Sequence, residues 1–144
     1  MPVSAAVLDD LLRARLPPGL KIPPPCLLGM QGQPLEYEDG QWLSMRFPVL
    51  EAYQNPLGYM QGGFIAAALD NTLGPFSYLI APPSVTSHLS LDYLRPVPPG
   101  MAYIDCIARL VSRTRHNLYL SGEVVGPEGK VLVLAHCTSH LLGP

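Results

Sequence analysis

A chain of 144 residues is long enough for one domain with a buried core, and we expect a single domain over residues 1–144. Hydrophobic residues make up 48% of the chain and charged residues 14%, with a net charge of −2. The high hydrophobic content excludes a disordered tail. The slightly negative net charge does not provide the excess of basic residues with which a protein binds the phosphates of a nucleic acid, so it excludes a nucleic-acid-binding protein. A few arginines could still hold a small anionic ligand.

The chain carries three cysteines without CxxC spacing, Cys26, Cys106 and Cys137. An odd number without that spacing is typical of reduced thiols, so we expect ordinary buried residues in a cytoplasmic protein. Asp9 and Asp10 stand where a signal peptide has positive charge followed by an apolar run. The histidines have no metal-ligand spacing, so we expect no metal.

The first predicted element is a short helix from Ser4 to about Arg15. Ser4 is a preferred N-cap residue, leucines recur at helical spacing, and arginines lie late, as the helix dipole favours. Pro17 ends this helix, and the prolines that follow predict a connector as far as Pro34. Residues 1–34 are therefore expected to be an N-terminal helix and a proline-rich connector of the same domain.

From Leu35 the apolar residues recur at every second position. The pattern predicts a hairpin with a turn at residues 38–40 and a second strand over residues 41–49. Leu43, Met45 and Phe47 share one face of that strand, and polar residues dominate the other face. One covered face and one wetter face is typical of an antiparallel sheet.

A long apolar helix is predicted to begin near Gly62 and to weaken at Gly74-Pro75. It is apolar nearly all round, and such a helix is normally enclosed by other elements. The stretch Phe64–Ile80 approaches the length of a membrane span, but Asp70 and its polar neighbours interrupt it. We therefore expect no membrane crossing.

Further strands are predicted over residues 85–93, 101–111, 118–125 and 130–141. In the first of them, Val85, Leu89 and Leu91 are expected on one face, with Thr86 and His88 on the polar face. Strands grouped after a single long helix predict an α+β fold with one antiparallel sheet. We expect this sheet to wrap around the enclosed helix.

Gly62 and Gly63 are the first candidates for a functional role. Glycines at a helix start expose backbone N–H groups, and the positive end of the helix dipole lies behind them, so they could polarise a carbonyl or hold an oxyanion. The alternative is that the two glycines only form a tight turn from loop to helix. A lone glycine pair does not distinguish this structural role from the functional one.

Asp70 is the single carboxylate in the apolar helix. At a rise of about 1.5 Å per residue it lies roughly 12 Å along the axis from Gly62, whereas one reacting group must lie about 3 Å from each. If both belong to one site, they come from two copies of the chain related by a two-fold axis. The alternative for Asp70 is a carboxylate hydrogen-bonded within the core.

Each of the other candidate site residues, taken alone, is weaker evidence for a functional site. Asn55, before Pro56, could orient a water molecule or the substrate, or could only signal a turn. The Thr86 hydroxyl could support an attacking water, or could belong to a solvated strand face. Three arginines are the best candidates for phosphate contacts, although surface arginines are usually only solvated: Arg95, Arg113 and Arg115. No Gly-x-Ser-x-Gly motif appears, which counts against an α/β-hydrolase.

Two motifs resemble a known family. The pattern Asn55-x-x-Gly58-x-x-Gln61-Gly62-Gly63 followed by Asp70 resembles the signature of hotdog-fold acyl-CoA thioesterases of the phenylacetate-degradation (PaaI) type. The segment from Tyr93 to Val97, followed by Gly100, resembles the strand-end motif of the same family. The resemblance runs from about Leu35 to Leu142, and it implies the hotdog fold and an acyl-CoA substrate.

The family's roles then fall on matching positions. Asp70 would be the general base or nucleophile, the Gly62 and Gly63 backbone of the opposite subunit would polarise the thioester carbonyl, and Asn55 would help position the water or carbonyl. Thr86 would lie near the attacking water. The groove for CoA would be lined by Arg95, Arg113, Arg115, Asn117 and His140. No cofactor is implied beyond the CoA of the substrate, and the site requires a homodimer or a dimer of dimers.

Three positions depart from the family pattern. Gln61 stands where the family usually has histidine, and glutamine does not titrate near neutral pH, so an acid–base role at this position is absent. His88 stands where an acidic residue is common, and Thr114 where the basic connector often has glycine. The main expectation is a thioesterase; the alternative, motivated by Gln61, is a non-catalytic protein that binds acyl-CoA or a fatty acyl group. A hotdog dehydratase or hydratase is disfavoured, because no Asp and His pair has that spacing.

Overall fold

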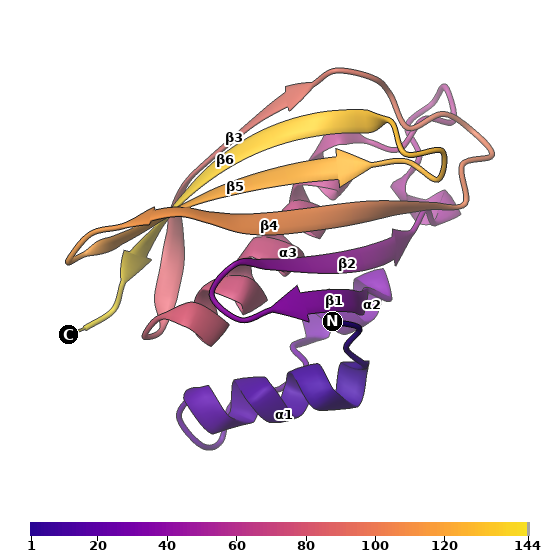
Figure 1. Cartoon of the computed structure of the whole chain (residues 1–144). Helices are drawn as coiled ribbons and strands as arrows, with labels where there is room; N and C mark the ends of the chain where they lie inside the picture. Colours follow the sequence, from indigo (N-terminus) through magenta and orange to yellow (C-terminus); the bar gives the residue numbers. More distant parts are fainter. Residues whose placement is uncertain (144) are drawn as a thin grey trace.

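A computed structural model describes residues 1–143 of the chain, and its centre is a six-stranded antiparallel sheet that curves around one long helix (Figure 1). The strand order in the sheet is β1-β2-β4-β5-β6-β3, which leaves β1 and β3 at the edges. The elements in chain order are α1 (Ala5–Arg15), α2 (Pro25–Met30), β1 (Gln33–Glu38), β2 (Trp42–Pro48), a short 3₁₀ turn (Glu51–Tyr53), α3 (Gly62–Ile80), β3 (Ser84–Tyr93), β4 (Tyr103–Arg113), β5 (Asn117–Val125) and β6 (Val131–Leu141).

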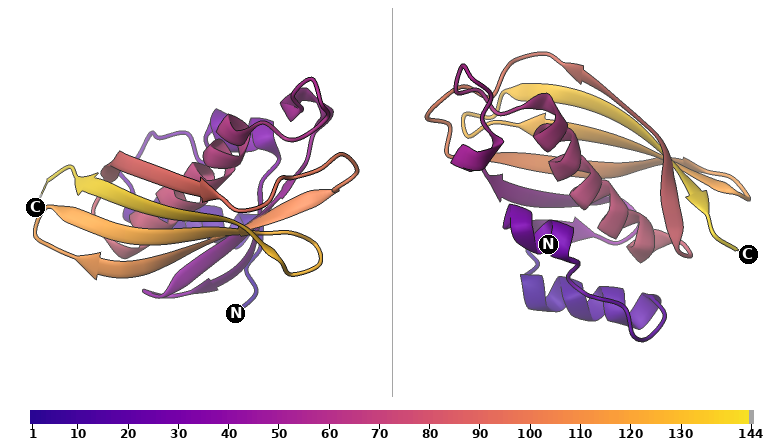
Figure 2. Two further views of the ribbon diagram at one scale, coloured as in Figure 1. Left: turned by 90° about the horizontal axis from the view of Figure 1, so that it is seen from above. Right: turned by 180° about the vertical axis from the view of Figure 1, so that it is seen from behind.

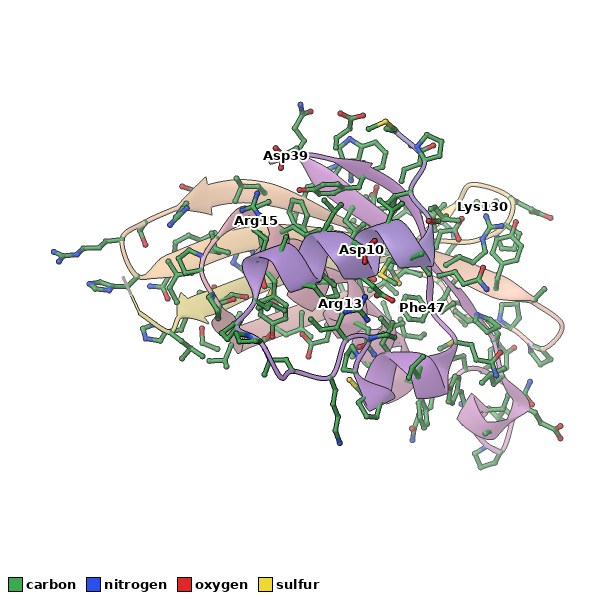
Figure 3. The ribbon with its side chains drawn as sticks, turned by 90° about the horizontal axis from the view of Figure 1, so that it is seen from below. Asp10, Arg13, Arg15, Asp39, Phe47 and Lys130 are labelled. Carbon is green, nitrogen blue, oxygen red and sulfur yellow. The ribbon has the colours of Figure 1, made fainter. Side chains whose placement is uncertain are left out.

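The N-terminal helix α1 begins where its capping residue predicts. The Ser4 hydroxyl oxygen accepts a hydrogen bond from the backbone N–H of Val7 at 3.2 Å, and Leu8 and Leu12 are buried. Figure 3 shows the side of the molecule that α1 covers, with Arg13 on its exposed surface. The predicted helix is confirmed, and its apolar face packs against α3 and β1.

The connector that follows contains a helix, so the prediction of irregular chain as far as Pro34 is wrong. Helix α2 has Pro25 at its first position, where a missing N–H costs nothing, and ends at Gln31 in the left-handed conformation. Leu27 and Met30, three residues apart, are buried against the core. This buried face stabilises a helix that the neighbouring prolines obscure in the sequence.

Helix α3 also runs further than predicted, because it continues through Gly74 and Pro75 to Ile80. Pro75 has no N–H to donate to the carbonyl of Asn71, and an interior proline costs about 3 kcal/mol. Beyond the proline, Phe76 and Leu79 are buried to 1% exposure or less. Burying two such side chains contributes roughly 1.5–3 kcal/mol each, which offsets the loss.

Figure 2 shows α3 on the concave face of the sheet, with α1 and α2 on the same side of the molecule. The sheet-facing side of α3 is buried, and it includes Ile65, Leu69 and Leu73. The opposite side carries small residues, and Gly63 and Asp70 on it are exposed. The sheet therefore wraps around α3 as predicted, but within one chain part of the helix remains open.

The first hairpin is confirmed. β1 pairs with β2 across the turn at Asp39 and Gly40, and Leu43, Met45 and Phe47 of β2 are fully buried beneath α3. The outer face of β2 is polar, and there the Arg46 guanidinium donates two hydrogen bonds to Asp105, at 2.8 and 2.9 Å. This bidentate pair joins β2 to β4 on the side away from the helix.

A bulge in β3 corrects the predicted faces of that strand. Thr86 pairs with Ser139 and His88 with Thr138, so Ser87 has no partner position on β6. One inserted residue shifts the alternation of every side chain before it. Thr86 therefore lies on the inner face, toward α3, while Val85 lies on the outer face with an exposure of 50%. The prediction that Thr86 shares a polar face with His88 is wrong.

The approach of α3 to the sheet predicts a stability effect at Gly122. A Cβ atom on Gly122 would lie 3.1 Å from Leu69 of the helix and 3.4 Å from Ala135 of β6. We expect Gly122→Val to lower the free energy of unfolding by about 1–3 kcal/mol, because the larger side chain pushes the helix away from β5. Urea denaturation of the purified protein measures this change.

The matched control is Ser121→Val, which adds a valine at the neighbouring, outward position of β5. Surface changes of this kind stay within about 0.5 kcal/mol. Equal destabilisation by both variants would contradict the tight contact between Gly122 and α3.

Candidate active site

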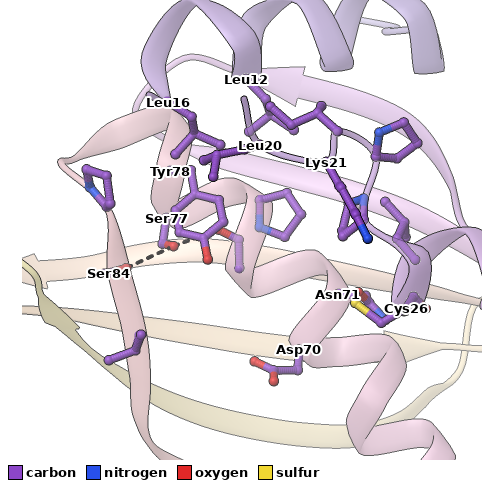
Figure 4. A pocket seen from close by; sticks show the side chains of 18 of the residues that line it. Leu12, Leu16, Leu20, Lys21, Cys26, Asp70, Asn71, Ser77, Tyr78 and Ser84 are labelled. Atoms are coloured by element: carbon purple, nitrogen blue, oxygen red, sulfur yellow. Dashed lines mark hydrogen bonds between the residues drawn. The ribbon is translucent and has the colours of Figure 1, made fainter. Parts of the chain in front are cut away.

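Asp70 lies on the open side of α3, and its nearest polar partner is Thr86. The Thr86 hydroxyl donates a hydrogen bond to the Asp70 carboxylate at 2.9 Å. Both side chains are exposed and both line one cavity. Figure 4 shows Asp70 in that cavity. Asp70 is therefore not a carboxylate closed off in the core, and it is accessible to a water molecule or a substrate.

The local fold explains why these two side chains meet. Thr86 reaches α3 only because the bulge at Ser87 turns it inward, and the Ser87 hydroxyl donates to the Thr138 carbonyl at 3.1 Å. Two residues before Thr86, the Ser84 hydroxyl donates a hydrogen bond to the Ser77 hydroxyl of α3 at 3.2 Å. The start of β3 is thus tied to α3 by two hydroxyl contacts.

Cys137, a residue of β6 close to the Asp70–Thr86 pair, is not a competing nucleophile. Burial raises the pKa of the Cys137 thiol, a hydrogen bond with Ser139 lowers it, and the charge of Asp70 raises it again. Burial likewise raises the pKa of the Cys106 thiol far above its usual range. A protonated thiol is a weak nucleophile, so Asp70 is the better candidate for a reactive group in this region.

Gly62 and Gly63 form the first turn of α3, eight residues before Asp70. Neither N–H donates a hydrogen bond to another group of residues 1–143, as expected at a helix start. The Tyr93 hydroxyl donates to the Gly62 carbonyl at 2.6 Å. A Cβ atom on Gly62 would lie only 3.1 Å from the Tyr93 ring. Gly62 is therefore needed for a close contact, and its free N–H is available to an acceptor.

Asn55 builds the loop before α3. Its side-chain oxygen accepts from the N–H groups of Leu57 and Tyr59, at 2.9 and 3.1 Å. Its backbone N–H donates to the Tyr59 carbonyl at 2.7 Å. The turn interpretation of Asn55 therefore holds, and only its amide NH₂ group remains for a substrate contact.

Gln61 occupies the N-cap position of α3 but makes no side-chain capping bond. Its backbone N–H donates to the Tyr53 carbonyl at 2.8 Å, and its side chain is exposed. The side chain lies beside Gly63, since a Cβ on Gly63 would be 3.9 Å from the Gln61 amide oxygen. Gln61 is thus free to hydrogen-bond a group held at the helix start.

The candidates for CoA contact divide between the two ends of the sheet. Arg113, Arg115, Asn117 and His140 lie at or near the turn between β4 and β5, where Asn117 and His140 approach to 3.4 Å. Arg95 lies at the other end and donates to the Val131 carbonyl at 2.9 Å. Along β6, the seven residue-to-residue steps from Leu132 to Ser139 separate the two regions by roughly 23 Å.

An apolar pocket is also suggested in the sequence by four residues, Tyr59, Met60, Phe64 and Phe76, but none of them lines the cavity beside Asp70. Phe76 and Met60 are core residues with exposures of 0% and 4%, and Phe64 stacks on Tyr53 at a centroid distance of 4.4 Å. The cavity beside Asp70 has a volume of about 750 Å³ and is lined instead by the N-terminal segment, α3 and the start of β3. The sequence did not predict that the N-terminal segment forms one wall of this cavity. The leucines and prolines that follow Arg15 nevertheless make that segment apolar.

A comparison with family models decides the family. The model described as thioesterase superfamily matches residues 57–133, which is 77 of the 144 residues. This chain belongs to the thioesterase superfamily. No curated protein matches it.

Solved structures place this thioesterase-superfamily chain in the hotdog fold. The PaaI protein of the phenylacetic acid degradation operon of E. coli is 17% identical with a TM-score of 0.75, covering 94% of each chain. A phenylacetic acid degradation-related protein of Ralstonia eutropha is 24% identical with a TM-score of 0.77, covering 93% of this chain and 98% of that one. A Streptococcus mutans protein, described as bound to acetyl-CoA, is 22% identical with a TM-score of 0.71, covering 76% and 87%.

Two further observations concern the described residues 1–143. None of their helices is both long and apolar enough to cross a membrane. No three of their His, Cys, Asp or Glu side chains gather as a group that could hold a metal ion.

Proposed function

We propose that this chain hydrolyses an acyl-CoA thioester to a free acid and CoA, with Asp70 as general base or nucleophile. The observation that carries the proposal is the Asp70–Thr86 pair, joined at 2.9 Å, at the edge of an apolar cavity. Membership of the thioesterase superfamily supports it, as does the acetyl-CoA described in the Streptococcus mutans structure. No cofactor enters the reaction besides the CoA of the substrate.

In the general-base route, a water molecule held by Asp70 and Thr86 attacks the thioester carbonyl carbon. Asp70 takes one proton of the water, and the carbonyl oxygen becomes an oxyanion. Collapse of this intermediate breaks the carbon–sulfur bond, and the thiolate of CoA leaves and takes up a proton. In the nucleophilic route the carboxylate itself attacks the carbonyl, the carbon–sulfur bond breaks, and the thiolate of CoA leaves and takes up a proton. Water then hydrolyses the mixed anhydride, which releases the free acid and restores the Asp70 carboxylate.

The oxyanion donors of this proposal are the N–H groups of Gly62 and Gly63 in a second copy of the chain. Three features support a two-fold dimer. The two glycines lie about 12 Å along α3 from Asp70 of their own chain. β3 is an edge strand of ten residues with an unpaired side, and the small-residue side of α3 is open. Antiparallel pairing of two β3 strands brings Thr86 of one chain toward the Tyr93–Gly62 contact of the other.

The same dimer gives a reason for two separate sets of CoA candidates. Arg95 lies at the Gly62 end of the sheet, whereas Arg113, Arg115, Asn117 and His140 lie at the Asp70 end. In a site that combines the two ends, one CoA lies between arginines of both chains. Arginine suits the phosphates because its donors match two oxygens at once.

Thr86 gives a direct test of the proposed water site. We expect Thr86→Val, which removes the hydroxyl at nearly constant volume, to lower kcat by roughly 10- to 100-fold, since hydrogen bonds to charged groups contribute about 1.5–3 kcal/mol. KM should change little. Steady-state kinetics with release of the CoA thiol provide the measurement.

Thr86→Ser restores the hydroxyl and should recover most of kcat. Thr138→Val, at an outward position of β6 beside the bulge, is the control for a general effect on the sheet. If Thr86→Val retained full kcat, the hydroxyl would have no part in the reaction.

A second candidate function is acyl-CoA binding without hydrolysis. It is favoured by Gln61, which cannot transfer a proton near neutral pH and makes no capping bond in the structure. Calorimetry and a thioester panel separate the two. Tight CoA or acyl-CoA binding without turnover on any member selects the binding protein, whereas turnover selects the enzyme.

A further inference from the structure

The cavity beside Asp70 is elongated along α3 and has an apolar roof. Five lining residues of α3 lie beyond the carboxylate, and they end at Tyr78: Asn71, Gly74, Pro75, Ser77 and Tyr78. The roof comes from the N-terminal segment, and Figure 4 shows Leu12, Leu16 and Leu20 above Tyr78, with Asp70 at the opposite end. The site therefore opens into a mainly apolar channel whose lining also includes Asp9 and Lys21, and Tyr78 is the one aromatic side chain among its described lining residues.

The N-terminal wall is held in place by hydrogen bonds to three different elements. Arg13 of α1 donates to the Ile22 carbonyl at 2.8 Å, Tyr53 donates to the Gly29 carbonyl at 3.2 Å, and Asn71 of α3 donates to the Cys26 carbonyl at 3.4 Å. A wall fixed in this way is formed before a ligand arrives, which lowers the entropic cost of binding.

We propose that this channel binds the acyl chain of the thioester, and that the preferred substrate is a saturated, unbranched acyl-CoA of about ten carbons. The inference rests on the proposed function of Asp70. From Asp70 to Tyr78 the channel follows eight residues of helix, or roughly 12 Å. A C–C bond of about 1.5 Å advances an extended chain by roughly 1.25 Å, which gives about ten carbons. A phenylacetyl group is much shorter and leaves the far leucines uncovered.

Burial of one CH₂ group improves binding by about fourfold, so kcat/KM should rise by about that factor per added CH₂ until the channel is full. We expect a maximum near ten carbons and a decline beyond it. The measurement is kcat/KM for a series of saturated acyl-CoAs from acetyl to palmitoyl, with phenylacetyl-CoA beside it.

Gly74 allows the channel to be shortened without disturbing the core. A Cβ atom on Gly74 would meet no atom within 4 Å, and Gly74 lies four residues, or about 6 Å, beyond Asp70. We expect Gly74→Leu to lower kcat/KM for decanoyl-CoA by on the order of 1,000-fold, about fourfold for each of five CH₂ groups left unburied, and to shift the optimum to chains about five carbons shorter. Gly29→Leu is the matched control, because this helical glycine also has open space around it but does not line the channel.

Cys26 supplies a readout that does not depend on hydrolysis. It lines the channel and is exposed, while the other two cysteines are buried. We expect decanoic acid to slow alkylation of Cys26 by iodoacetamide at least tenfold, and acetic acid to have no effect. Gly74→Leu should abolish the protection, and Gly29→Leu should retain it.

The two readouts separate failure of the inference from failure of the proposed function. Protection by decanoic acid that Gly74→Leu removes supports the channel, even if no thioester is hydrolysed. Hydrolysis with a flat chain-length profile, unchanged in Gly74→Leu, overturns the channel while the thioesterase stands. Absence of both protection and chain-length preference also overturns it.

Discussion

Replacing Asp70 by asparagine should lower kcat by roughly 10²- to 10⁴-fold, the usual contribution of a positioned acid–base group. The amide keeps the size of the side chain and can still accept from the Thr86 hydroxyl, so the 2.9 Å contact and the helix should survive. An amide neither accepts a proton from water nor attacks a thioester near neutral pH. Thermal unfolding and circular dichroism should therefore match the unchanged protein while turnover is lost.

Asp92→Asn is the matched control. Asp92 is also an exposed carboxylate, but it lies on β3 opposite Leu134, at an outward position. Its replacement removes the same charge from the chain and should leave turnover within twofold. Full activity of Asp70→Asn would sink the assignment of Asp70 in either chemical route.

The second large effect is recovery of activity from two inactive variants. Asp70→Ala lacks the carboxylate, and Gly62→Val forces a side chain against Tyr93, where even a Cβ would lie at 3.1 Å. In a mixed dimer of the proposed kind, one of the two sites combines an intact Asp70 with an intact Gly62. Random exchange of equal amounts should therefore restore about one quarter of the activity of the unchanged protein.

The control mixture is Asp70→Ala with Thr86→Val. Both changes fall in the part of the site that one chain supplies, since the two side chains touch within that chain. Mixed dimers then hold no fully intact site, and activity should remain at the average of the two variants. Native mass spectrometry establishes that subunits have exchanged. Absence of recovery in the first mixture, with exchange established, would contradict a site shared between chains.

Local signals in the sequence predicted much of the fold. Ser4 and the leucine spacing placed α1, and strict alternation placed β2, because both elements bury one regular face. Helix α2 and the end of α3 were predicted wrongly for one reason. In each, proline argues against a helix locally, and burial of neighbouring side chains such as Leu27 and Phe76 outweighs it.

The residues of the candidate site likewise divide into those that local sequence signals predicted and those that only the folded chain reveals. Gly62, Gly63 and Asp70 stand out because glycine pairs and a charge are unusual in an apolar helix. The place of Thr86 was missed because one inserted residue does not change the composition of a strand. A signal was present, since Ser87 stands where strict alternation between Val85 and Leu89 requires an apolar residue. The proposed acyl channel had no such signal, because its lining residues are spread along the chain from Asp9 to Leu142.

The length of β3 has a consequence for how the two sites of the proposed dimer behave. The strand carries Thr86 near its start and Tyr93 at its end. It therefore positions the Asp70–Thr86 half of one site and the Gly62–Tyr93 half of the other. A slip of two residues in the pairing of two β3 strands would displace both sites together. The sites should thus be made or lost as a pair, and the specific activity should fall on dilution together with the fraction of dimer.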